Sequence, residues 1–362
     1  MALWELEELQ PPATLGFVRN LLPVPAYQGG IYLPEVTVDD VEFEYLMAAR
    51  ETPVMATVIS WDSESPIGSR PAQGEKIQGE MAPMKRKERI SEKEILRFLQ
   101  PRRGTQDENA AVAAVYARMA RLTRSIQART EWLQMQALSE PKLVYSEDGI
   151  VIEFDYGIPA AQRINLVTQT DGAGALPPGE FGPAWTMANV DTATPFSDLQ
   201  AIARRQENAT GTRPARMVLS RKMLDFLPYS TQLKGLIYQQ NAPDRPLSPE
   251  EINALMRRYD LPTFTTYDVK VKQEAANGTT TEVRTMDENR AFLLPASNVG
   301  QTLVGPTAES RVLLGTPYAQ AASGIWAATY PKDEPPSEWV KVAAVKFPTM
   351  PDAHMVSQFQ LA

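Results

Sequence analysis

The stretch from Glu108 to Leu138 constrains the fold more than any other, because it contains neither proline nor glycine and is rich in alanine. Apolar residues recur in it at spacings of three, four and seven, which predicts one amphipathic helix roughly 45 Å long at 1.5 Å per residue. The apolar stripe consists of Val112, Val115, Met119, Leu122, Ile126 and Leu133. The arginines largely off this stripe, which predict a solvated basic face, are Arg118, Arg121, Arg124 and Arg129. A coiled coil is disfavoured, because the heptad pattern is short and is broken at Arg129.

The absence of cysteine and the single histidine restrict the chemistry open to the chain. Thiolate nucleophiles, disulfides, iron–sulfur clusters, cysteine zinc sites and histidine-rich metal sites are all excluded. A Ser-His-Asp site would have to use His354, which we interpret as a surface residue in a Pro/Met/Asp loop. Carboxylate pairs such as Asp39-Asp40 and Glu250-Glu251 are adjacent in sequence and do not by themselves form a facing acid and base. We therefore expect no catalytic site, no cofactor and no metal.

The charge and hydropathy of the chain bear on its partners. Its net charge of −8 and pI of about 5.0 make it a poor general binder of nucleic acid, although it could still enclose DNA. No apolar run approaches the ~20 residues that span a bilayer, so we expect no membrane association. The N-terminal Glu5, Glu7 and Glu8 are unlike a signal peptide, which favours a cytoplasmic protein.

The N-terminal third is poor in residues that could form a core of their own. Residues 1–50 contain five prolines and are expected to form an extended arm that lies across another surface. Residues 53–90 predict a long hairpin, with a strand at Val54–Trp61, a loop, and a returning strand within Arg70–Met84. A basic run, Lys85–Arg89, is expected to be a solvated strand end or helix start. Ser91-Glu-Lys-Glu94 is a capping-box pattern that predicts a short helix from about Glu92 to Leu99.

The remaining sequence predicts a hairpin, a compact α/β unit over residues 194–315, and two strands in the tail. The hairpin joins Lys142–Tyr145 to Ile150–Phe154, and residues 171–184 form a Gly/Pro-rich loop without a phosphate-binding motif. In the α/β unit, helices begin at Pro195, after Ser220 and after Ser248, while Asn277-Gly278 predicts a hairpin turn. The strands are expected at Ala215–Leu219, Thr263–Val271, Ala291–Leu294, Gly324–Tyr330 and Trp339–Phe347. The chain is thus predicted to be an α+β protein whose extended segments need partners, which favours assembly over catalysis.

The order of these elements resembles the phage major capsid protein E family, whose fold is the Hong Kong 97-type capsid fold. The stretches that carry the resemblance span most of the chain. They are Thr57–Trp61 with Ile90–Ile95, the long helix ending Arg129–Leu138 with the hairpin that follows it, and Pro348–Asp352 running to Val356–Ala362.

The resemblance implies a division into regions. These are an N-arm over 1–50, an E-loop hairpin over 51–90, a peripheral domain over 91–193 with its spine helix at about 108–138, an axial domain over 194–315, and a return to the peripheral domain over 316–362. Residues 142–170 and the tail strands would build the long sheet of the peripheral domain. No long helical extension precedes the N-arm, so the resemblance implies a separate scaffolding protein.

The resemblance also implies a function. The chain would be the major capsid subunit of a tailed phage, assembling into hexamers and pentamers of an icosahedral head that encloses double-stranded DNA. Its partners would be further copies of itself and the portal, scaffolding and decoration proteins, first in the host cytoplasm and then in the virion. The expected assembly interface comprises Trp61, Ile67, Arg70, Lys76, Arg118, Arg121 and Arg124. Some members of the wider fold join a lysine to an asparagine, but we interpret Lys76 as a solvated lysine, without a crosslink to Asn298.

Two alternatives stay open at this point. An encapsulin-like nanocompartment shell would have the same fold and would need an inner pocket for a cargo peptide. A soluble carboxylate-based hydrolase would need a deep pocket with two facing acids in the isolated subunit.

Overall fold

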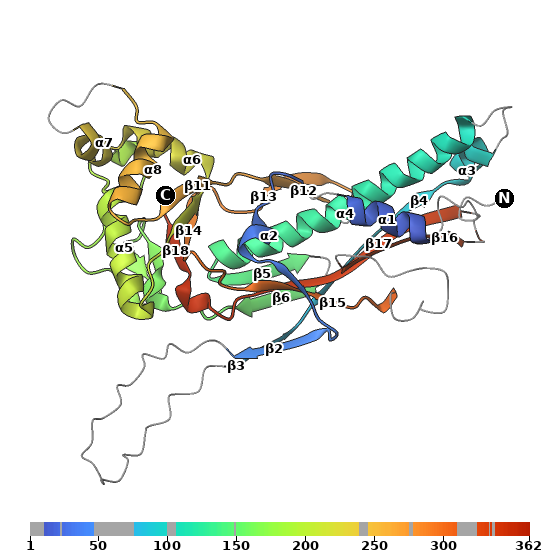
Figure 1. Ribbon diagram of the computed structural model, residues 1–362, viewed down its shortest axis with the longest axis horizontal. Helices are drawn as coiled ribbons and strands as arrows, with labels where there is room; N and C mark the ends of the chain where they lie inside the picture. Colours follow the sequence, from blue (N-terminus) through green and yellow to red (C-terminus); the bar gives the residue numbers. More distant parts are fainter. Residues whose placement is uncertain are drawn as a thin grey trace, which may run out of the picture.

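The computed structural model describes residues 11–21, 24–46, 76–99, 106–147, 150–238, 245–274, 278–309, 324–332, 334 and 337–362. The molecule is elongated (Figure 1). A long helix and long strands run along most of its length, and a cluster of shorter helices covers a second sheet at one end.

The predicted long helix is confirmed as α4, Gln106–Ser139. Its apolar stripe is buried over most of its length, with Val115, Met119, Leu122 and Ile126 each at most 3% exposed. These side chains pack against the apolar face of a sheet, which explains how so long a helix is held in place. The predicted short helix is confirmed as α3, Glu92–Leu99, and it leads into α4.

A five-stranded sheet is built around β17, Ser337–Thr349. One edge of β17 pairs with β4, Ala82–Ile90, so the basic run Lys85–Arg89 lies inside a strand. The strands β15, Gln301–Gly305, and β16, Ile325–Lys332, pair with consecutive stretches of β17, Gly305 opposite Val345 and Ile325 opposite Ala344. They therefore continue one another in register. β1, Glu35–Thr37, completes the sheet beside β15, and both tail strands are confirmed.

A seven-stranded sheet lies at the other end of the molecule. Its order is β11 (Thr263–Thr266), β10 (Arg216–Leu219), β14 (Arg290–Leu294), β18 (Ser357–Gln360), β7 (Arg163–Asn165), β8 (Thr170–Asp171) and β9 (Gly174–Ala175). The covering helices are α5 (Pro195–Thr210), α6 (Arg221–Phe226), α7 (Thr231–Tyr238) and α8 (Pro249–Arg258). The starts of α5, α6 and α8 are as predicted, and Ser248 and Glu251 form a complete capping box.

Three details of the predicted sheets are wrong. The expected strand Thr263–Val271 is two strands, β11 and β12, Lys270–Glu274, which belong to different sheets. Residues 142–170 and the tail strands were expected to build the long sheet, but residues 142–155 form a separate hairpin, and β7 and the last strand β18 lie in the seven-stranded sheet. β18 lies there because Phe359 and Leu361 are buried in the core under the helices. Conversely β15, from the predicted α/β unit, joins the long sheet.

Three two-stranded hairpins branch from these layers. β5 (Lys142–Glu147) pairs with β6 (Ile150–Asp155), and β12 pairs with β13 (Thr280–Arg284), as predicted. β2, Glu42–Leu46, pairs with β3, Lys76–Glu80. The outgoing strand of that hairpin thus begins before residue 51. The strand predicted at Val54–Trp61 lies outside the described residues. Single 3-10 turns are at Ala160–Gln162, Met187–Asn189, Leu227–Tyr229 and Ala353–Met355.

The expectation of an extended N-terminal arm is wrong in part. α1, Pro11–Asn20, is a helix, and α2, Gly29–Tyr32, is a single turn. Prolines are tolerated in the first turn of a helix, because the N–H groups there have no intrahelical partner. Val18 is buried among α4 and β16 side chains, and Tyr32 and Leu33 are buried in the adjoining core. The arm does lie across another surface, as predicted, and for the described residues that surface belongs to its own chain.

Candidate subunit interface

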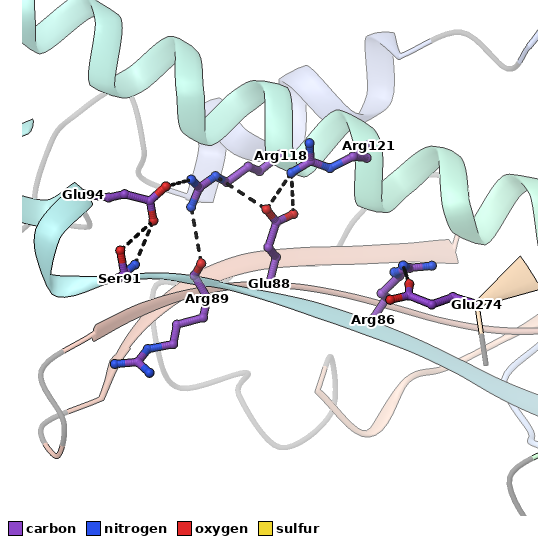
Figure 2. A network of polar contacts seen from close by, with 8 residues as sticks. All are labelled: Arg86, Glu88, Arg89, Ser91, Glu94, Arg118, Arg121 and Glu274. Atoms are coloured by element: carbon purple, nitrogen blue, oxygen red, sulfur yellow. Dashed lines mark hydrogen bonds and ion pairs between the residues drawn. The ribbon is translucent and has the colours of Figure 1, made fainter. Parts of the chain in front are cut away.

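The structure places four of the seven expected interface residues. Trp61, Ile67 and Arg70 lie outside the described residues. Lys76 is the first residue of β3. The three arginines lie on α4. Arg118 and Arg121 face β4, and Arg118 also contacts α3 (Figure 2). Arg124 is exposed.

Arg118 is held by an ion-pair network inside the subunit (Figure 2). Its guanidinium lies 2.5 Å from Glu94 of α3 and 3.7 Å from Glu88 of β4. It also donates a hydrogen bond of 3.5 Å to the carbonyl oxygen of Arg89. The side chain is only 15% exposed, so the expectation of a solvated residue is wrong for Arg118. A carboxylate on each neighbouring element compensates for its burial.

Arg121 and Arg124 are more accessible. Arg121 donates to both carboxylate oxygens of Glu88, at 2.6 and 2.7 Å, but its side chain is 66% exposed. Arg124 is exposed, one helical turn further along α4. Of the three arginines, Arg124 is therefore the one whose charge is most available to a neighbouring subunit.

The carboxylates of the network come from a motif that the sequence shows only in part. The predicted capping pattern is present, since the Ser91 N–H donates to Glu94 at 2.9 Å. That hydrogen bond lowers the pKa of Glu94, burial opposes the change, and Arg118 lowers the pKa further. Glu88 was missed as a partner because it lies among basic residues. The alternation of a strand would have placed it on the face opposite Lys87.

Alternation divides the basic run between the two faces of β4. Arg86 and Glu88 face α4, and Arg86 pairs with Glu274 of β12 (Figure 2). On the other face, Lys85 lies 2.9 Å from Glu309, and the Lys87 ammonium lies 4.7 Å from the ring centroid of Trp339. All residues of the run except Glu88 are exposed, which confirms the expected solvated strand end, and the ion pairs and the Trp339 contact are additional to it.

Glu309 is a second point of charge pairing. Its carboxylate, 9% exposed, lies 2.6 Å from Lys341 in addition to Lys85. Burial raises the pKa of Glu309, but the hydrogen bonds from Lys341 and Lys85 outweigh this and lower the pKa to about 2. The ionised pair links β4 and β17 to the end of the segment that follows β15.

The β2–β3 hairpin is anchored to the body by aromatic packing. The Phe43 ring lies 5.7 Å from Phe154 and 5.2 Å from Phe347, measured between centroids. Gly79, opposite Phe43 in the ladder, has no room for a side chain, because a Cβ there would lie 2.7 Å from the Phe43 ring. The hairpin leaves the lower side of the molecule in Figure 1 from this rigid base.

Glu131 of α4 fixes the N-terminal segment. Its buried carboxylate accepts hydrogen bonds from the N–H groups of Gln28, at 2.9 Å, and Gly29, at 3.0 Å, and from the Tyr267 hydroxyl, at 2.7 Å. Burial raises the pKa of Glu131, and these hydrogen bonds oppose that shift. Gly29 is needed because a Cβ there would lie 2.2 Å from the side-chain oxygen of Gln134.

No arrangement for catalysis was found in the part of the chain that the structure describes. Within it no three acidic or histidine side chains could hold a metal ion, and no helix is long and apolar enough to cross a bilayer. Asp40 accepts hydrogen bonds from the N–H groups of Val41 and Glu42 in a turn, and Glu251 caps α8. His354 is half-buried in a 3-10 turn of the Pro/Met/Asp segment, and burial lowers its pKa while Asp352 opposes the shift.

Comparison with solved structures identifies the fold. The capsid protein proposed for a prophage of Escherichia coli CFT073 matches with a TM-score of 0.62 and 17% identity, covering 98% of this chain and 99% of that one. A phage-related protein of Bordetella bronchiseptica RB50 matches with a TM-score of 0.56 and 12% identity, covering 97% of both chains. The capsid of Myoviridae phage XM1 is a weaker match, with a TM-score of 0.44, 11% identity, and 96% and 92% coverage. The sequence matches no curated protein.

The fold is that of the Hong Kong 97-type phage capsid proteins, with mixed helix and sheet as predicted. The profile of the phage major capsid protein E family matches residues 18–356, and the chain belongs to that family. The predicted family and the predicted role as a structural capsid subunit are confirmed.

Proposed function

We propose that the chain is the major subunit of an icosahedral phage head that encloses double-stranded DNA without sequence-specific contacts. The family match over residues 18–356 carries this proposal. The net charge of −8 supports it, because a chain with an excess of carboxylates is a poor general binder of the phosphates of packaged DNA. Hexamers and pentamers form in the host cytoplasm with scaffolding and portal proteins, decoration proteins bind the completed shell, and the subunit has no enzymatic activity.

The described elements support roles for the regions of the subunit. The seven-stranded sheet with α5 to α8 is the axial domain, which clusters around the capsomer axes. α4 and the long sheet are the peripheral domain. The hairpin that starts at β2 and returns at β3 is the base of the E-loop, which lies on an adjacent subunit. Its anchoring at Phe43 supports this role, because a projecting arm needs a rigid base to position its far end.

Negative-stain electron microscopy of the expressed protein, alone and with a co-expressed scaffolding protein, tests the proposal. We expect closed shells, tubes or capsomer rings whose abundance rises with protein concentration. A monomer or small dimer under both conditions would contradict it. Shells that regularly purify with one enclosed enzyme would instead identify a nanocompartment.

The exposed charge of Arg124 provides a sharper test of the interface. We propose that Arg124 pairs with an acidic residue of a neighbouring subunit. Arg124→Glu should then reduce shell yield while the melting temperature of the free subunit stays the same. The matched control is Arg258→Glu, which is exposed at the end of α8 in the axial domain. Equal shell yields for wild type and Arg124→Glu would refute the role of Arg124 and leave the shell function standing.

A further inference from the structure

A groove of about 570 Å³ opens beside the middle of α4. Its floor is α4 from Ser125 to Leu133. One side is formed by residues 82–87 of β4 and another by residues 271–274 of β12. The β5–β6 hairpin contributes the remaining wall. Arg86 and Glu274 form an ion pair between the two strands (Figure 2).

Both strands that border the groove have an unused edge. β4 pairs with β17 and β12 pairs with β13, and within the described part of the chain neither has a partner on its other edge. An unpaired strand edge presents a row of backbone donors and acceptors to any extended segment that enters beside it. An extended segment in the groove would therefore lie beside two strands that each have an unpaired edge.

The lining combines apolar and cationic groups. The cross-strand neighbours Val271 and Val283 are half-buried on one wall, and the Arg129 guanidinium lies 5.4 Å from the Trp132 ring centroid on the floor. Lys272 is exposed at the rim. The carboxylate among the lining residues is Glu274, which is already paired with Arg86. Such a groove suits an extended segment with apolar side chains on one side and acidic side chains on the other.

We propose that this groove binds residues 1–10 of a second copy of the chain. This segment contains Glu5, Glu7 and Glu8 and no basic side chain. Trp4, Glu5, Leu6 and Glu7 alternate between apolar and acidic, so in an extended conformation both apolar side chains face one way and both acidic ones the other. The inference rests on the proposed shell function, which brings the copies together.

The path of the N-terminal segment favours a second copy over the same one. The Phe17 ring packs 4.6 Å from Tyr116, and Gly29 is bound to Glu131, so the chain runs along α4 in the direction of increasing residue number. Pro11 therefore lies at the end of α1 that is remote from the groove. The distance from Pro11 back to Arg129, counted along α1 and α4 at 1.5 Å per helical residue, is roughly 30 Å. Ten extended residues span at most about 36 Å, which leaves too little length to fill the groove.

Peptide binding to the full chain, in its unassembled state, tests the docking directly. A fluorescent peptide of residues 1–12 should bind saturably. Its Kd should rise about fivefold or more with a peptide that carries glutamine at all three glutamate positions, and similarly with the Lys272→Glu protein. Salt at about 0.5 M should weaken binding, because it shortens the Debye length to roughly 4 Å. Arg258→Glu, on α8 and outside the groove, is the matched control and should leave the Kd unchanged. No saturable binding, or equal binding of the neutral peptide, would overturn the proposal.

Disulfide trapping in assembled particles identifies the copy. The chain has no cysteine, so introduced thiols have no competitors. Particles assembled from a mixture of Leu6→Cys and Gln273→Cys chains should yield covalent pairs of chains on mild oxidation. Shells without these pairs would overturn the proposal while the shell function stands. If covalent pairs form with Thr57→Cys in place of Leu6→Cys, and not with Leu6→Cys, the segment around residue 57 occupies the groove. That result would also overturn the proposal. Failure to form any shell would count against the proposed function, and the peptide measurement would then decide the docking alone.

Discussion

Removing Arg118 should destabilise the isolated subunit, although its position on a basic helix face suggests an assembly residue. Arg118→Ala removes two ion pairs and a hydrogen bond to a backbone carbonyl. Exposed ion pairs contribute about 0.2–1 kcal/mol, and charged hydrogen bonds that are shielded from water about 1.5–3 kcal/mol. Arg118 is 15% exposed and its carboxylate partners are about a third exposed, so an intermediate cost of about 1.5 kcal/mol follows.

The assay is thermal unfolding of the unassembled subunit. An unfolding entropy of about 2 cal/mol/K per residue converts this cost into a fall in melting temperature of roughly 2 °C for a chain of this length. Arg118→Glu should cost more, about 3 kcal/mol, because it places a third carboxylate beside Glu88 and Glu94. Arg124→Ala is the matched control on the same helix, and should change the stability by less than about 0.5 kcal/mol.

A double-mutant cycle shows whether the ion pair is the cause. Combining Arg118→Ala with Glu94→Ala should give a coupling energy of about 1 kcal/mol, which falls as salt is added. The reasoning is refuted if Arg118→Ala is as stable as Arg124→Ala, or if the two substitutions in the cycle are additive.

Three further predictions concern the other anchoring points. Gly29→Ala should lower the free energy of unfolding by about 2 kcal/mol or more, because its Cβ would lie 2.2 Å from the Gln134 side chain. It should also increase proteolysis of the N-terminal segment. Gly30→Ala, whose Cβ would have nothing within 4 Å, should leave the digestion pattern unchanged. The lowered pKa of Glu309 contributes stability that is present above its ordinary pKa of 4.5 and is lost as the pH falls towards about 2. The stability of Glu309→Gln should therefore fall less than that of the wild type over this pH range. Parallel acid unfolding curves for the two proteins would contradict the role of Glu309. Gly79→Ala should lower shell yield more than subunit stability, as measured by microscopy and calorimetry on one preparation, because its Cβ would lie 2.7 Å from an aromatic ring at the base of the β2–β3 hairpin.

The elements that were predicted correctly are those with local causes. α4 follows from an unbroken period of apolar residues, and α8 from the capping box at Ser248. The β12–β13 hairpin follows from the turn at Gly278, whose φ of +80° is a conformation that glycine adopts without strain. None of these requires knowledge of what the segment packs against.

The errors have non-local causes. β18 has an ordinary strand sequence, and only its long-range pairing with β14 and β7 assigns it to the seven-stranded sheet. The helix α1 was hidden by its prolines, because its stability comes from packing Val18 against α4 and β16. Likewise the pairing of Arg118 with Glu94 depends on the angle at which α3 returns along α4. Tertiary packing decides each case, and the local pattern does not reveal it.

The charge distribution shows that several cations of this acidic chain are paired with carboxylates of the same subunit. In the basic run, strand alternation directs Arg86 towards Glu274 and Lys85 towards Glu309, on opposite faces of β4. On α4, Arg118 is likewise neutralised inside the subunit. Such pairing leaves the net charge of −8 unchanged, so like-charged subunits repel at long range. Assembly must then depend on a few local complementary sites, and the groove beside α4, with its cations and unpaired strand edges, is suited to be one of them.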